Sequence, residues 1–151
     1  MNMDFNKIDQ AIAKRMCYWG IPALRISFAI IFFWFGILKP LGLSSASELL
    51  KDTVAWLPFL KPDTWLVVIG WWEVAIGITF LFKKTTRIAI ALLFLQMVGT
   101  FMPFVFLPEV TVQDGNYLKP TLIGQYILKN IMIISAALVL GGTCHQKKEE
   151  K

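Results

Sequence analysis

Four long apolar stretches, separated by short polar connections, dominate the pattern of the chain. They cover residues 19–38, 65–82, 87–107 and 121–142. Each is close to the ~20 residues that an α-helix needs to cross the ~30 Å hydrocarbon core of a bilayer. The pattern therefore predicts an all-α integral membrane protein, with a four-helix transmembrane bundle over residues 19–142.

The polar segments at the two ends are short, so the chain has no room for a separate soluble domain. Residues 1–18 place Phe5, Ile8 and Ile12 at helical spacing. This spacing fits a cytoplasmic amphipathic segment and a disordered tail equally well. Residues 143–151 are predicted to form a solvated cytoplasmic tail.

The connections between the spans carry their own signals. In residues 44–57, Ser45 and Glu48 match a capping box and apolar residues follow at helical spacing. We expect a short amphipathic helix on the outer face, which either covers exposed apolar surface or acts as a lid. The later connection, residues 108–120, is predicted to be a polar loop.

Glycines and prolines mark local features within the spans. Gly70 and Gly77 permit close helix packing in the second span. Pro103 removes a hydrogen bond to the Gly99 carbonyl and predicts a kink in the third span. Pro22 is expected to lie in the first turn of the first membrane helix.

The distribution of charge predicts the orientation of the bundle. Of 151 residues, 56% are hydrophobic, against about 45–50% in an ordinary soluble domain. If the N-terminus is inside, the inner segments hold nine of the 15 basic residues and the outer segments hold four. This bias predicts that both termini are cytoplasmic. It also explains the net charge of +5 without nucleic acid as a partner.

The cysteines predict neither a disulfide nor a metal site. Cys17 and Cys144 both lie near the predicted inner face, where thiols stay reduced, and the chain has no C-x-x-C motif. Cys144 and His145 are neighbours, but two ligands do not make a metal site.

Six polar residues inside the spans are the candidate functional set, because ionisable groups at membrane depth are costly and commonly functional. They are Arg25, Glu73, Gln96, Gln125, Lys129 and Asn130.

Depth along the helices predicts how this set is paired. Glu73 and Lys129 each lie ~12 Å below the outer end of their span, at 1.5 Å per residue. We therefore expect these two to pair, with Gln96 and Asn130 satisfying the remaining donors and acceptors. Arg25 is a second cation, which leaves an excess of positive charge for water or an anionic ligand to balance.

Two interpretations of the set remain open. It forms a ligand or proton site, or it only joins the helices, as polar residues do in membranes. At the predicted outer mouth, Lys39 accompanies Trp34, Trp71 and Trp72. These tryptophans either flank a slot for a flat apolar ligand such as a quinone, or pack and face lipid like other membrane tryptophans.

Three sequence segments together resemble a known family. They are Arg25 followed by FWFGILKP, then WWEVAIGI with a basic turn after it, and GQYILKN at the start of the fourth span. Over about residues 20–142 the chain resembles the DoxX-like family of small four-helix bacterial membrane proteins. The resemblance implies a bundle in the bacterial cytoplasmic membrane and a link to thiosulfate:quinone oxidoreductase and redox-associated membrane complexes. The matching polar positions are Arg25, Lys39, Glu73, Lys129 and Asn130.

Two functional hypotheses follow. The first is a membrane subunit of a redox system that binds a quinone, with Glu73 and Lys129 handling a proton or polarising a carbonyl. The second is a non-enzymatic scaffold or assembly factor whose buried ions are structural. Besides the bilayer, the expected partner is another subunit or a second copy. A transporter is a third option, for which the chain shows no inverted repeat.

Overall fold

The structure is a computed structural model that describes the backbone of residues 2–149 and the side chains of residues 5–143. Within this part of the chain, four helical segments are long and apolar enough to cross a membrane. The prediction of four apolar spans is therefore confirmed, and the chain is mostly helical, although the all-α prediction missed a short β-hairpin. The segments are Phe5–Leu38, Pro62–Leu81, Lys83–Phe106 and Leu122–Thr143.

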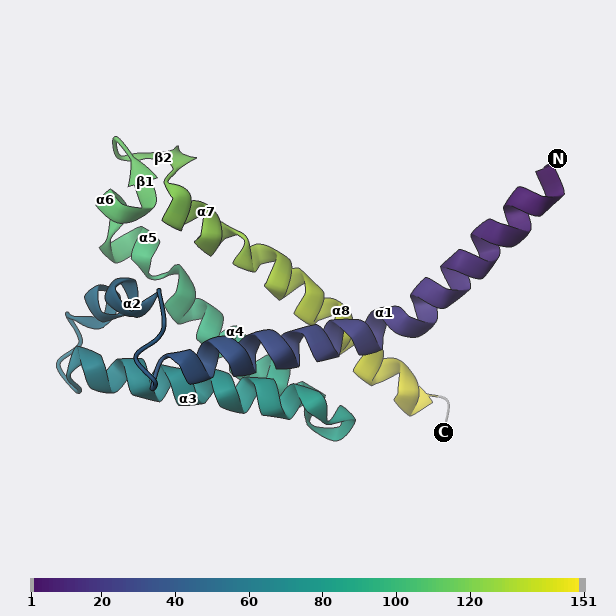
Figure 1. Cartoon of the computed structure of the whole chain (residues 1–151), viewed down its shortest axis with the longest axis horizontal. Coiled ribbons are helices and arrows are strands. Elements are labelled where there is room, and N and C mark those ends of the chain that lie inside the picture. The colour runs from purple at the N-terminus through teal and green to yellow at the C-terminus, as the bar shows by residue number, and fades with distance from the viewer. Residues whose placement is uncertain (1, 150–151) are drawn as a thin grey trace.

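Helix α1 (Asn2–Leu38) is longer than the sequence pattern predicts. It runs for 37 residues with Pro22 in its interior, so the prediction that a helix begins near Pro22 was wrong. At 1.5 Å per residue it is about 55 Å long, well beyond the ~30 Å of hydrocarbon. The N-terminal part of α1 runs away from the other helices and at an angle to the rest of α1 (Figure 1). An interior proline is the usual cause of such a bend.

Helix α3 (Pro62–Leu81) packs along α1 with almost no side chains between the two backbones. A Cβ added at Gly36 would lie 2.7 Å from the backbone nitrogen of Val74. One added at Gly77 would lie 2.6 Å from the backbone nitrogen of Phe33. The close approach predicted from the glycines is therefore confirmed. We call this contact the glycine seam; its glycines are Gly36 on α1 and Gly70 and Gly77 on α3.

The third span is interrupted at its proline, as predicted. The short 3₁₀ turn η1 (Lys83–Thr85) leads into α4 (Thr86–Phe101). Helix α4 ends before Pro103, where the short helix α5 (Pro103–Phe106) begins. The Met102 N–H donates to the Gly99 carbonyl at 3.2 Å and closes the end of α4.

A β-hairpin follows the one-turn helix α6 (Pro108–Thr111), where the sequence analysis expected only a loop. Strands β1 (Val112–Gln113) and β2 (Asn116–Pro120) pair antiparallel. Asp114 and Gly115 between them both have positive φ, 52° and 67°. That is the signature of a type I′ turn, for which Asp-Gly is a preferred pair.

The fourth span is two helices, α7 (Leu122–Leu128) and α8 (Asn130–Glu149), interrupted at Lys129. The Asn130 side chain donates to the carbonyls of Ile127 at 3.0 Å and Tyr126 at 3.3 Å. This side chain therefore satisfies backbone acceptors where the helix is irregular, as Ser, Thr and Asn side chains do in membrane helices.

Helix α2 (Ser47–Val54) lies in the connection between the first two spans, but the predicted capping box was wrong. The N-cap is Ala46, whose N–H donates to Ser44 Oγ at 3.3 Å. Within α2, Lys51 pairs with Asp63 of α3 at 2.7 Å. The hydrogen-bonded Asp63 carboxylate raises the pKa of Lys51.

The apolar core lies toward the η1 end of the bundle. It contains buried residues of α1, α3, α4 and α8, among them Phe28, Ile76, Phe80, Leu93 and Leu140. Toward the opposite end, which we call the α2 end, α7 and the start of α8 diverge from α1 (Figure 1). The start of α1 and the last turns of α8 both lie away from the α2 end.

The glycine seam yields a stability prediction. Gly36→Ala should lower the thermal midpoint of the purified protein in mild detergent, because the new Cβ meets backbone atoms of α3. Such overpacking costs about 1–3 kcal/mol. Gly20→Ala on the same helix is the control, since its Cβ would meet nothing within 4 Å. Equal midpoints for the two variants would contradict the seam.

Candidate functional site

A buried ion pair joins the end of α1 to the middle of α3. Lys39, which directly follows α1, donates from Nζ to Oε2 of Glu73 and to the Phe35 carbonyl at 3.3 Å. The two side chains are only 7% and 12% exposed. Burying both charges requires that each be paired and hydrogen-bonded, and this geometry meets the requirement.

Helix α4 completes the coordination of the carboxylate. Gln96 donates from Nε2 to the second oxygen of Glu73, Oε1, at 2.9 Å. The backbone carbonyl of Gln96 accepts from the Thr100 hydroxyl at 3.1 Å. Glu73 therefore connects α1, α3 and α4 through two oxygen atoms.

A tight turn after α1 places the lysine. Gly42 has a φ of 70°, and its N–H donates to the Lys39 carbonyl at 3.1 Å. The Leu43 N–H donates to the Leu38 carbonyl at 2.9 Å. These two bonds with a glycine of positive φ form a Schellman motif, which ends the helix and reverses the chain. Leu38 and Leu43 then lie on the same cavity wall.

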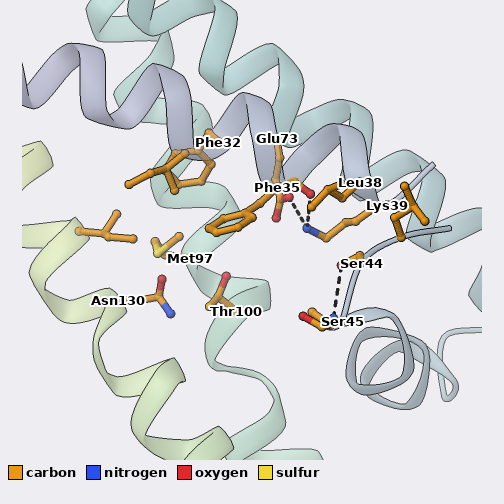
Figure 2. A pocket seen from close by; sticks show the side chains of 14 residues that line it. Phe32, Phe35, Leu38, Lys39, Ser44, Ser45, Glu73, Met97, Thr100 and Asn130 are labelled. Carbon is orange, nitrogen blue, oxygen red and sulfur yellow. Dashed lines mark hydrogen bonds and ion pairs between the residues drawn. The ribbon is translucent and has the colours of Figure 1, made fainter. Parts of the chain in front are cut away.

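The ion pair lies on the wall of a cavity of about 390 Å³, which is within the range of small-molecule sites. Residues of α1, α3, α4, α8 and the turn before α2 line it, and Figure 2 shows their side chains around one space. The apolar lining residues are Ile31, Phe32, Phe35, Leu38, Leu43, Ala46, Met97 and Ile133. The polar ones are Lys39, Ser44, Ser45, Glu73, Thr100 and Asn130.

Glu73 pairs with Lys39, and not with Lys129 as the sequence analysis predicts. Lys129 is exposed, and its ammonium lies 4.7 Å above the Tyr126 ring centroid. The fourth span is not the single regular helix along which the depth of Lys129 was counted. The interruption at Lys129 changes which residue faces the cavity, and Asn130 takes that place.

Arg25 lies at the η1 end, away from Glu73. Its guanidinium donates to the Leu81 carbonyl at 2.9 Å and to the Phe80 carbonyl at 3.2 and 3.3 Å. It therefore caps the C-terminus of α3, where a cation is favoured by the helix dipole. Gln125 is also outside the cavity, and it donates to the Pro120 carbonyl at 3.5 Å.

The three deep tryptophans do not line the cavity. Trp34 and Trp71 are 62% and 54% exposed, and Trp72 donates from its indole nitrogen to the Leu92 carbonyl at 3.2 Å. The aromatic rings on the cavity wall are instead those of Phe32 and Phe35.

Sequence reasoning missed most of the apolar wall, although a usable signal was present. Residues three, four or seven positions from a polar residue share its helix face. Phe32 and Phe35 have this spacing to Lys39, and Thr100 has it to Gln96. Ile133 has it to Asn130.

No cluster of three or more His, Cys, Asp or Glu residues that could hold a metal occurs among the residues described. The prediction that Cys144 and His145 form no metal site concerns side chains outside the described residues.

The ion pair yields a prediction about stability. Glu73→Gln should destabilise the protein by about 3–5 kcal/mol, because it leaves the Lys39 ammonium buried without a counter-charge. Glu73→Gln combined with Lys39→Met should recover most of that loss in thermal unfolding. Lys51→Met, which breaks an exposed pair, should change little. A double variant no more stable than Glu73→Gln would count against this account.

Comparison with known proteins identifies the family. A family model described as DoxX matches residues 20–107, more than half of the 151 residues. No curated protein and no solved structure matches the chain. With its four apolar helices, the match makes this a multi-pass membrane protein and confirms the resemblance found in the sequence. The chain belongs to the DoxX family.

Proposed function

We propose that the chain is the membrane subunit of a quinone-linked redox system, and that a quinone binds in the cavity beside Lys39 and Glu73. The observation that carries the proposal is a cavity with an apolar wall and one charged, hydrogen-bonding end. Ligand sites have this composition, since apolar area supplies affinity and a few polar groups fix orientation. The link of DoxX-like proteins to thiosulfate:quinone oxidoreductase points to the same ligand class.

The chemistry of the lining suits a quinone ring. Phe32, Phe35 and Met97 offer aromatic and thioether surface for a flat ring. An ammonium has three donors, and Lys39 spends two on Glu73 and the Phe35 carbonyl within the described residues. The third can bind a quinone oxygen and stabilise negative charge on it.

Reduction of a quinone to a quinol takes two electrons and two protons. The Lys39 and Glu73 pair is the candidate for handling a proton, in place of the Glu73 and Lys129 pair expected from sequence. The electrons would come from a partner subunit that carries a redox group, because this sequence has neither a C-x-x-C nor a haem-attachment motif.

A second function is favoured by one specific observation. Both oxygens of Glu73 and two donors of Lys39 are already satisfied by protein groups. A pair so complete could serve only to fix the helices in a scaffold or assembly factor.

The deciding experiment is native mass spectrometry of the protein in mild detergent, with analysis of extracted small molecules. We expect a bound quinone in the wild type and its loss when Glu73→Gln is combined with Lys39→Met. Gln125→Leu is the matched control, because Gln125 belongs to the polar set but lies outside the cavity. A protein without quinone, holding only a partner chain that the double variant retains, would establish the scaffold instead.

We also propose that both termini face the cytoplasm of a bacterial cell, with the α2 end outside. The support is the excess of basic residues in the segments 1–18, 83–87 and 143–151. A C-terminal fusion to a fluorescent protein that folds only in the cytoplasm should be bright. The same position fused to a periplasmic phosphatase should be inactive, and the reverse pattern would overturn the orientation.

A further inference from the structure

The two helices on opposite sides of the cavity, α1 and α8, diverge where the cavity lies. Near the η1 end, Phe28 of α1 and Leu140 of α8 belong to the same buried core. Toward the α2 end, α7 and the start of α8 run away from α1, while α3 stays against α1 along the glycine seam (Figure 1). The cavity therefore lies between helices that stay close together on the α3 side and separate between α1 and α8.

The edges of the side between α1 and α8 are exposed at the surface of the bundle. Ile31 and Phe35 line the cavity from α1, yet they are 42% and 57% exposed. Ile133 lines it from α8, and the preceding Met132 is 74% exposed. Phe35 and Ile31 lie about 5 and 10 Å from the end of α1, at 1.5 Å per residue. This depth is within one half of a ~30 Å hydrocarbon layer.

The α2 end of the cavity is bounded by a segment that is itself largely exposed. Ser44, Ser45 and Ala46 form its wall there, directly before α2. Lys51 ties α2 to α3, and Trp56 after α2 stacks on Phe106 of α5 with ring centroids 4.7 Å apart. A route from water would pass this tethered segment, whereas a route from the bilayer would pass the side chains of Phe35 and Ile133.

We infer that the cavity opens sideways into the hydrocarbon between α1 and α8, and that its ligand is a long-tailed membrane amphiphile. The polar head reaches Lys39 and Glu73, and the tail leaves between Phe35 and Ile133 into the bilayer. The inference rests on the proposed ligand-binding function and specifies the ligand class and its path. A tail left in lipid requires no further protein surface, because lipid chains are as apolar as leucine.

A photoreactive probe tests the path directly. The probe is a benzoquinone with a decyl tail that carries a diazirine close to the ring, added to the full chain in lipid nanodiscs. After illumination, mass spectrometry of peptides should find labels on residues 31–35 and 130–134. Background is set by the same tail and diazirine without the quinone.

Two matched variants sharpen the test. Ile133→Trp should narrow the opening and reduce specific labelling about tenfold, the equivalent of about 1.4 kcal/mol. Leu138→Trp, an exposed position on the same helix outside the cavity, should leave labelling unchanged.

The outcomes separate the two proposals. Specific labels on residues 43–46 and on α2, with none on residues 31–35 or 130–134, would overturn the lateral path while leaving quinone binding intact. Equal labelling in the two tryptophan variants would do the same. Labelling no greater than that of the quinone-free probe would overturn both the ligand site and the path into it.

Discussion

The buried pair of Lys39 and Glu73 is the interaction on which the rest of the bundle depends. In a medium of low dielectric constant, neither charge is tolerable alone, so the end of α1, the middle of α3 and a side chain from α4 must meet. Gln96 donates to the second oxygen of the Glu73 carboxylate, and the Schellman turn at Gly42 fixes the backbone position of Lys39. The polar end of the cavity is thus a by-product of satisfying one carboxylate.

The close apolar packing and the cavity lie in different halves of the bundle. Close apolar packing lies toward η1, where Arg25 also caps α3. The other half has diverging helices, interrupted backbones at Pro103 and Lys129, and the cavity. Irregular backbone at membrane depth is tolerated where it is buried or lines a cavity. Asn130 does both tasks, since it satisfies backbone carbonyls and contributes to the cavity wall.

Sequence patterns predicted the architecture better than the site. The four spans follow from length and hydropathy, the helix interruption from Pro103, and the close packing from Gly70 and Gly77. Glu73 and Gln96 were identified because polar groups at this depth are rare. Lys129 was predicted as the partner of Glu73 on the assumption that each span is one straight, regular helix. That assumption fails at Lys129. Lys39 was predicted to lie at the outer mouth, and its burial against Glu73 was missed. That burial depends on a turn and on the glycine seam, which bring together residues far apart in sequence.

The glycine seam also has a genetic consequence. Every missense change at a glycine codon adds at least a Cβ, and at Gly36, Gly70 and Gly77 that atom meets neighbouring backbone or side-chain atoms closer than 3 Å. Any substitution at these three glycines should therefore disturb the backbone spacing that brings Lys39 to Glu73, although glycine itself carries no side chain. In a population of random mutants, loss of the ion-pair geometry should therefore arise from these codons as well as from those of Lys39 and Glu73.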